Sequence, residues 1–175
     1  MIRSCLDEYT RTRLVAKAKR DTPERYKRRT DSGDDWKFEQ IDLLELQSTS
    51  DLSLTFRVKT YKVQLKILKY SQTLDQYLTG KYSKDIRKAI RKSVEYAMKY
   101  NHIQVVCDCP DFKYRFAYMA TQRGYGLDTH EDRPANITNP RSKGGLCKHI
   151  MRVANAPSQW MPRVVTAIRG YVKNL

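Results

Sequence analysis

Long apolar runs are missing from this sequence. No stretch approaches the roughly 18 consecutive apolar residues of a transmembrane helix, so we expect no membrane-spanning segment. The residues from Met1 to Cys5 carry no apolar core of the kind found in signal peptides, and we expect no secretion by that route. The chain has four cysteines at uneven spacing. Without a signal peptide, they favour a reducing intracellular compartment over a disulfide-stapled extracellular one.

The sequence also lacks the motifs of the common enzyme classes. It has no Walker loop, no His-Glu-x-x-His and no Gly-x-Ser-x-Gly. The acids between Asp31 and Asp51 could include nuclease ligands, but their spacing gives no support for that over a connector. We therefore expect a protein that is not an enzyme and has no small-molecule substrate. A nuclease or transposase fragment is the enzymatic alternative.

Acidic residues are few relative to basic ones. The chain has 34 Lys+Arg against 19 Asp+Glu, which gives a net charge of +15. This excess favours a polyanionic partner, either nucleic acid or an acidic protein surface. The alternative is a basic protein that is merely soluble. The length of 175 residues and the 40% hydrophobic content predict one folded domain with or without appendages.

Two pairs of metal-ligand residues lie far apart in the chain. Cys107 and Cys109 follow an apolar run, and Cys147 and His149 follow two glycines. Three thiolates and an imidazole are a complete tetrahedral ligand set for zinc. Residues two apart in a strand point to the same face, so both cysteines of the first pair can face one ion. The set leaves no position for water, which predicts a structural zinc site rather than a catalytic one.

Other interpretations of these residues stay open. A disulfide from Cys147 to Cys107 or Cys109 is possible and would leave His149 unexplained, whereas a Cys107–Cys109 bridge is sterically poor. The cysteines could instead be unrelated buried thiols. His102 is a fallback ligand, although a role at the edge of a strand is favoured. If Cys147 begins a helix, the helix dipole favours its thiolate.

The pattern Cys-x-Cys followed at a distance by Cys-x-His resembles the SWIM zinc finger, a small module of transposase-like and DNA-repair-associated proteins. The resemblance implies a short sheet before the first pair, a helix from the second pair, and Cys107, Cys109, Cys147 and His149 as the zinc ligands. The chain departs from the family in spacing, because 37 residues separate the two pairs, more than is usual.

A longer string gives a closer resemblance. The segment Cys-Asp-Cys-Pro-Asp-Phe-Lys-Tyr-Arg-Phe-Ala-Tyr, with Gly-Gly-Leu-Cys-Lys-His later, is similar to SWIM-like proteins encoded by tailed bacteriophages. Those proteins are usually regarded as virion components, and the resemblance covers about a third of this chain. It implies a location in the virion, or otherwise inside the cell, and other structural subunits as partners.

Residue patterns elsewhere predict an α+β fold, with a small antiparallel sheet, flanking helices and one structural zinc site. Alternating apolar residues predict a hairpin over 52–69 with its turn at Thr60-Tyr61, and a strand over 102–106 that pairs with it. A further strand is expected over 36–41. Helical spacing predicts helices over 3–20, 84–100 with Ser83 as N-cap, 111–123, 146–150 and 158–172, and the stretch 124–145 is expected to be a loop.

The aromatic helix predicted over 111–123 has two kinds of residue. Phe112, Phe116 and Met119 are expected to pack beside the zinc. Tyr114 and Tyr118, with the arginine between them, could stack on bases, although this is the less favoured interpretation.

We divide the chain into residues 1–50, a basic helical arm with an acidic connector, and residues 51–175, the α+β zinc-binding domain. Because residues 1 to 30 are too charged to pack alone, we expect partner chains to bury them. The acidic connector could fold back on the arm or face a neighbouring subunit. The candidate contacts to partners or to nucleic acid of any sequence are basic residues: Arg11, Arg13, Lys17, Lys19, Arg20, Arg25, Lys27, Arg28, Arg29, Lys84, Arg87, Lys88, Arg91 and Lys92.

These observations together predict a non-enzymatic, zinc-stabilised structural protein of a large assembly, such as a bacteriophage virion component. It would contact DNA or other subunits through its basic faces. The alternative is a SWIM-type nucleic-acid-binding protein that acts outside a particle.

Overall fold

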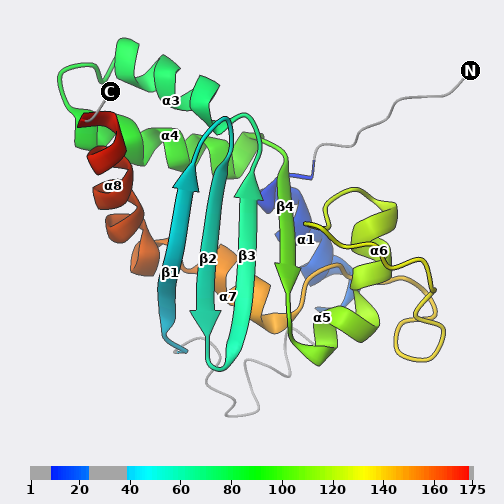
Figure 1. The fold of residues 1–175 in the computed structure, drawn as a ribbon. Helices are drawn as coiled ribbons and strands as arrows, with labels where there is room; N and C mark the ends of the chain where they lie inside the picture. The colour runs from blue at the N-terminus through cyan, green and yellow to red at the C-terminus, as the bar shows by residue number, and fades with distance from the viewer. Residues whose placement is uncertain (1–8, 24–38, 174–175) are drawn as a thin grey trace, which may run out of the picture.

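A four-stranded antiparallel sheet lies at the centre of the computed structural model, which describes residues 9–23 and 39–173 (Figure 1). The strands follow one another across the sheet in chain order. They are β1 (Ile41–Ser48), β2 (Leu52–Val58), β3 (Tyr61–Ile67) and β4 (Ile103–Cys107). The predicted fold class, an α+β protein with a small antiparallel sheet, is confirmed.

β2 and β3 form the predicted hairpin. Val58 pairs with Tyr61, so the turn is Lys59-Thr60, one residue earlier than predicted. Lys59 has a φ of 54°, the left-handed conformation that two-residue hairpin turns favour. β4 then pairs with β3 as predicted, with Cys107 opposite Val63. The hairpin therefore brings the first cysteine to a defined position at the edge of the sheet.

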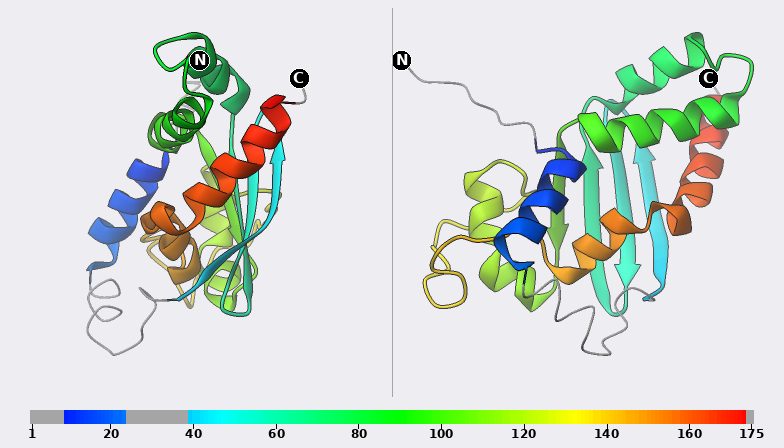
Figure 2. Two further views of the ribbon diagram at one scale, coloured as in Figure 1. Left: turned by 90° about the vertical axis from the view of Figure 1, so that its left-hand side faces the viewer. Right: turned by 180° about the vertical axis from the view of Figure 1, so that it is seen from behind.

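The helices of the described residues are arranged mainly on one side of this sheet. They are α1 (Arg11–Asp21), α3 (Tyr70–Thr79), α4 (Ile86–Tyr100), α5 (Pro110–Arg115), α6 (Ala117–Gln122), α7 (Lys148–Asn155) and α8 (Pro157–Lys173). Figure 2 shows α1, α7 and α8 behind one face of the sheet, with α4 across the ends of the strands. α3 packs along α4, and α5 and α6 lie beside β4 (Figure 1).

The core lies between the helices and the sheet. Alternate side chains of the hairpin are almost fully buried there: Leu52, Leu54, Phe56, Val58, Val63, Leu65 and Ile67. The ring centroid of Trp160 in α8 lies 5.4 Å from that of Phe56, and its indole N–H donates to the Val153 carbonyl at 3.0 Å. The predicted apolar stripe of α4 is buried as well, except for Ile86 at its start, which is 38% exposed, so both periodicities are confirmed.

Several predicted boundaries are wrong in detail. Thr10 is extended and its side chain accepts a hydrogen bond from the Arg13 N–H, so α1 begins at Arg11. α4 is capped by Asp85 instead of Ser83, because the Asp85 carboxylate accepts from the Lys88 N–H at 2.9 Å. The helix predicted over 111–123 breaks at Phe116, which separates α5 from α6. α3 was not predicted. The described part of the strand predicted over 36–41 is strand only at its last residue.

α1 packs on its own chain. Leu14 and Ala18 are buried in the core, and the Tyr9 carbonyl accepts from the Ile103 N–H at 3.0 Å. The prediction that this segment is too charged to pack alone is therefore wrong for α1, because its buried apolar residues and the backbone contact with β4 dock it on the fold. Residues 1–8 and 24–38 lie outside the described residues. The domain boundary at residue 50 stays a prediction, although β1 and β2 pair across it.

The described part of the acidic connector pairs with the hairpin and α8, an arrangement that the sequence analysis did not consider. The ion pairs are Glu39–Lys59 at 2.6 Å, Asp42–Arg57 at 3.6 Å, Asp42–Arg163 at 4.0 Å and Asp51–Lys66 at 3.3 Å. These carboxylates partly neutralise basic residues of the hairpin and of α8.

Candidate metal centre

Cys107, Cys109, Cys147 and His149 come together in one buried cluster that could hold a metal ion. One ligand atom from each residue lies within 4.8 Å of the others. The Cys107 Sγ is 3.8 Å from the His149 Nδ1. Two such ligands of one tetrahedral zinc lie about 3.5 Å apart, given bonds of about 2.3 Å to sulfur and about 2.0 Å to nitrogen. The donor set and its spacing therefore fit a metal ion of this kind.

The end of β4 and the start of α5 position the first ligand pair. Cys107 is the last residue of β4 and points to the buried side with Ile103 and Val105. Cys109 is the N-cap of α5, and its sulfur accepts a hydrogen bond from the Phe112 N–H at 3.3 Å. The strand and the following helix thus present both sulfurs to the same buried space. As predicted, Phe112, Phe116 and Met119 are buried in the core.

The start of α7 positions the second pair. Cys147 is the N-cap of α7, and His149 lies in its first turn. The Tyr61 ring at the start of β3 packs against the imidazole of His149, with ring centroids 4.5 Å apart. The Nε2 atom of His149 is buried with no hydrogen-bond partner among the described residues. The Nδ1 atom faces the Cys107 sulfur, so this nitrogen is placed to bind a metal ion, and the packing against Tyr61 holds the ring in that orientation.

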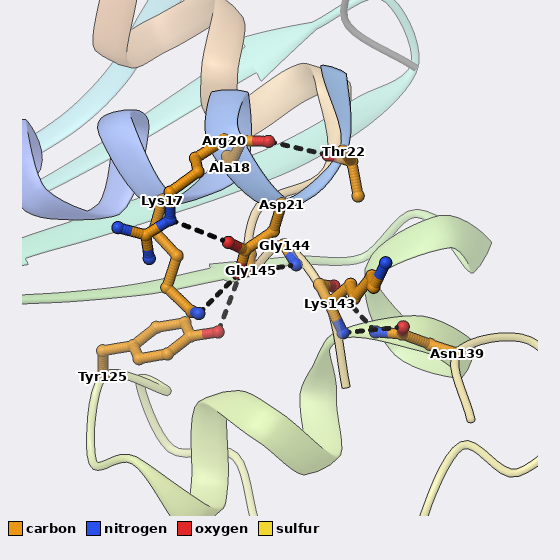
Figure 3. A network of polar contacts seen from close by, with 10 residues as sticks. All are labelled: Lys17, Ala18, Arg20, Asp21, Thr22, Tyr125, Asn139, Lys143, Gly144 and Gly145. Atoms are coloured by element: carbon orange, nitrogen blue, oxygen red, sulfur yellow. Dashed lines mark hydrogen bonds and ion pairs between the residues drawn. The ribbon is translucent and has the colours of Figure 1, made fainter. Parts of the chain in front are cut away.

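A network of polar contacts holds the loop that leads into Cys147 (Figure 3). Asp21, the last residue of α1, accepts a hydrogen bond from the Gly144 N–H at 3.4 Å. The Tyr125 hydroxyl donates to the Gly145 carbonyl at 3.1 Å. The Asn139 side chain bonds both the N–H and the carbonyl of Lys143, each at 2.9 Å. Segments from both halves of the chain therefore fix the approach to the second ligand pair.

Neighbouring cations keep the Asp21 carboxylate charged, which strengthens its hydrogen bond with Gly144; we call this contact the Asp21 clamp. Its carboxylate lies 2.5 Å from the Lys17 Nζ and 3.2 Å from the Arg20 Nε. Burial alone would raise the pKa of Asp21, but the hydrogen bonds from Lys17, Arg20 and Gly144 outweigh it and hold the pKa below its ordinary value. Asp21 is therefore ionised at neutral pH and can accept all three bonds.

The three sulfurs hold their protons unequally. The hydrogen bond between Cys107 and Cys109 raises the pKa of Cys107 to about 12 and lowers that of Cys109. Burial, with further hydrogen bonds to the other sulfurs, raises the pKa of Cys147 well above its usual value. Burial therefore dominates the pKa of this thiol, and the expected effect of the helix dipole stays a prediction. A metal ion would displace the remaining thiol protons.

The other interpretations of these residues are not supported. Cys107, Cys109 and Cys147 are all free, so the alternative disulfide is not formed. His102 is not part of the cluster: its Nδ1 accepts from the Tyr9 N–H at 3.2 Å, and its Nε2 lies 3.1 Å from the Gly124 carbonyl. This histidine therefore fixes the docking of α1 at the start of β4, in line with the role at a strand edge.

Some of the α1 residues that were predicted to contact a partner bond to other residues of this chain, and others lie on the exposed side of the helix. The Arg11 Nη1 donates to the Ala154 carbonyl at 2.9 Å, and Lys17 and Arg20 contact Asp21. Arg13 and Lys19 lie on the exposed side of the helix. Four further candidates lie outside the described residues: Arg25, Lys27, Arg28 and Arg29. At least three α1 residues thus contact the fold of their own chain.

The predicted contacts on and before α4 form a basic surface. Lys84, Arg87, Lys88 and Arg91 are exposed and Lys92 is half-buried. Glu95 pairs with two of them, Arg91 at 3.1 Å and Lys92 at 2.7 Å. Arg87, Lys88 and Arg91 also line a groove of about 590 Å³ together with apolar and hydroxyl residues of α8. This surface is therefore open to a partner.

Sequence reasoning missed the residues that support the metal ligands. Asp21 and Gly144 are 123 positions apart, and no local spacing relates them. Comparison of the chain with protein-family models, curated proteins and solved structures finds no match. Among residues 9–23 and 39–173, no helix combines the length and apolar character needed to span a membrane.

Proposed function

We propose that this chain is a non-enzymatic, zinc-stabilised structural subunit of a large assembly, with a metal centre of the SWIM type. The observation that carries the proposal is the closed set of four buried ligands, three sulfurs and one nitrogen. This donor set favours zinc over harder cations. Because four protein ligands leave no position for water or substrate, the metal would stabilise the fold and take no part in a reaction.

The placement of the ligands supports a role in joining elements. A zinc ion held by Cys107, Cys109, Cys147 and His149 would connect the end of β4, the start of α5 and the start of α7. The chain from Pro110 to Leu146, which includes α6 and the loop over 124–145, lies between the two ligand pairs. A single ion would therefore hold the two ends of this long segment together.

The partner surface is proposed to be the basic face of α4 with the residues just before it. Its exposed Lys and Arg side chains suit phosphates or an acidic surface of another subunit. The resemblance to SWIM-like virion proteins favours a place in a bacteriophage particle. The second candidate is a SWIM-type nucleic-acid-binding protein outside a particle, which the same exposed face also favours.

Metal analysis of the purified protein tests the zinc centre. One zinc per chain is expected, and the Cys147→Ser/His149→Ala variant should bind none. Cys5→Ser is the control, because this cysteine is not among the four ligands. Zinc retained at full occupancy in the double variant would overturn the proposed centre.

Gel shifts at increasing salt test the basic face. Retardation of DNA that weakens steeply with salt is expected if the face contacts phosphates. Absence of any retardation at low salt would show that the basic residues do not bind nucleic acid, and would leave contact with other subunits as their role.

A further inference from the structure

Four tyrosines form a continuous row on the surface of α3, α4 and the loop between them. The rings of Tyr77 and Tyr82 stack in parallel, with centroids 5.9 Å apart and 1° between their planes. Tyr77 also contacts Tyr96 at 5.9 Å, and Tyr96 contacts Tyr100 at 4.6 Å. We call these four residues the tyrosine row. Tyr96 and Tyr100 are 42% and 49% exposed, so much of their ring surface faces solvent.

Basic side chains accompany the tyrosine row. The Nζ atoms of Lys81 and Lys88 lie 6.0 and 5.4 Å from the ring centroid of Tyr82, and that of Lys99 lies 4.9 Å from Tyr100. From Tyr70 to Tyr100 the sequence has seven basic residues against three acids, Asp75, Asp85 and Glu95: Lys81, Lys84, Arg87, Lys88, Arg91, Lys92 and Lys99. The surface is therefore both aromatic and positively charged.

Packing of the core does not account for these rings. The residues with which α4 fills the core lie on its buried stripe, and Tyr96 and Tyr100 are not among them. Tyr70 of α3, by contrast, is a core residue. It is fully buried, and its hydroxyl and that of Ser93 share a hydrogen bond of 2.9 Å. A contiguous patch of partly exposed aromatic rings more often marks an interaction site than a solvated surface.

We propose that the tyrosine row binds single-stranded nucleic acid, with bases stacked on Tyr96 and Tyr100 and phosphates beside Lys88 and Lys99. The inference rests on the polyanion binding proposed above. It specifies single-stranded nucleic acid as the polyanion and the tyrosine row as the place where it binds. Aromatic faces combined with cations bind single strands of any sequence, because every unpaired base has a π face. A duplex keeps its bases stacked on each other, so this surface prefers single strands to duplexes.

The test compares binding of fluorescein-labelled oligothymidylate and of a matched duplex by fluorescence anisotropy. Replacing Tyr96 and Tyr100 by alanine is expected to weaken oligothymidylate binding roughly tenfold for each ring. The salt dependence should stay unchanged, because a tyrosine neutralises no phosphate. The Tyr96→Phe/Tyr100→Phe variant keeps the aromatic faces and should bind as the wild type does. Circular dichroism and zinc content check that every variant is folded.

Tyr114→Ala is the matched control. Tyr114 is 62% exposed and has Lys113 at 5.6 Å from its ring, but it belongs to α5, outside the tyrosine row. Its loss should leave binding unchanged. An equal loss of affinity there would overturn the placement in favour of the less favoured interpretation, in which Tyr114 itself stacks on bases. Binding of oligouridylate as well as oligothymidylate supports the inference, since the stacking surface is the same for RNA and DNA.

The remaining outcomes separate this inference from the function on which it rests. If single strand and duplex bind equally and the alanine variant matches the wild type, the tyrosine row is not the site while polyanion binding stands. If neither nucleic acid binds at low salt, the inference fails, and contact with acidic surfaces of other subunits stays as the proposed role of the basic face. Binding of the wild type to anionic lipid vesicles without binding to oligothymidylate would overturn the inference in favour of a membrane surface.

Discussion

Asp108 and Lys62 hold each other by two hydrogen bonds. The Lys62 N–H donates to the Asp108 Oδ1 at 2.9 Å, and the Asp108 N–H donates to the Lys62 carbonyl at 3.2 Å. Asp108 stands between Cys107 and Cys109, so these bonds continue the pairing of β3 and β4 past the last strand residue. The backbone between the two sulfurs is thereby fixed to the hairpin.

The contact between Asp108 and Lys62 is expected to keep the first ligand pair in position. Asp108→Ala should lower zinc affinity about tenfold, because residues that orient ligands typically contribute by that factor. Competition with a chelator measures the affinity. Asp51→Ala is the control, since the Asp51 Oδ1 accepts the Lys69 N–H at 2.8 Å in a similar bond. Equal losses in the two variants would mean that general stability, and not ligand positioning, is responsible.

Removal of the metal should destabilise the protein. Chelation is expected to reduce the free energy of unfolding by several kcal/mol, because binding free energy of a structural zinc is folding free energy. The raised pKa values of Cys107 and Cys147 mean that metal binding releases their protons, so zinc affinity should fall as the pH is lowered. Thermal unfolding with and without chelator, at several pH values, measures both effects. An identical melting temperature in the two conditions would contradict the structural role.

The Asp21 clamp is expected to contribute to the free energy of unfolding in a pH-dependent way. Asp21→Asn should cost about 1 kcal/mol of stability at neutral pH, since the charged hydrogen bonds are lost. The folded-state pKa of Asp21 is lowered, so its contribution is present above the unfolded pKa of about 4 and is lost as the pH falls through the folded value. Denaturant unfolding should therefore show the two proteins converging in acid. A difference independent of pH would contradict the ionic origin.

Gly144 is expected to be intolerant of a side chain. Its φ is 74°, and a Cβ there would lie 3.3 Å from the Thr22 Cγ2 and 3.4 Å from the Phe116 Cε1. Gly124 is a matched control with a φ of 71° and no atom within 4 Å of its Cβ position. Alanine should cost roughly 1 kcal/mol at both for the backbone strain, with an additional loss only at Gly144. Urea unfolding compares them, and equal losses would show that the close packing contributes nothing.

Charge reversal tests the basic face of α4. Arg87→Glu with Arg91→Glu should lower nucleic-acid affinity and reduce the slope of log affinity against log salt by roughly 0.7–0.9 for each lost phosphate contact. Arg133→Glu is the control, because Arg133 is exposed and already pairs with Glu131 at 2.8 Å. Binding curves at several salt concentrations provide the slopes. An unchanged slope in the α4 variant would exclude this face. The same reversal at Arg28, outside the described residues, extends the test to the predicted arm.

The spacing of residues within short stretches of sequence predicted most of the individual strands and helices and the metal ligands. The alternation in β2 and β3, the buried stripe of α4 and the four ligand residues are all evident over short stretches of sequence. Contacts between distant segments could not be found that way. The pairing of Asp21 with Gly144 has no sequence signal, and neither has the hydrogen bond from Arg11 to the Ala154 carbonyl that helps to dock α1. The tyrosine row has one local signal, the spacing of four between Tyr96 and Tyr100.

The distance in sequence between Asp21 and Gly144 also sets an order of events in folding. The β2–β3 hairpin has a two-residue turn and can form in about 1–10 μs, as other hairpins do. The contact between Asp21 and Gly144 spans 123 positions, and the loop it closes carries a larger entropy cost. During synthesis, α1 leaves the ribosome long before its partner loop. The contact between Asp21 and Gly144 must therefore wait for the last third of the chain, and its closure is a late step of folding.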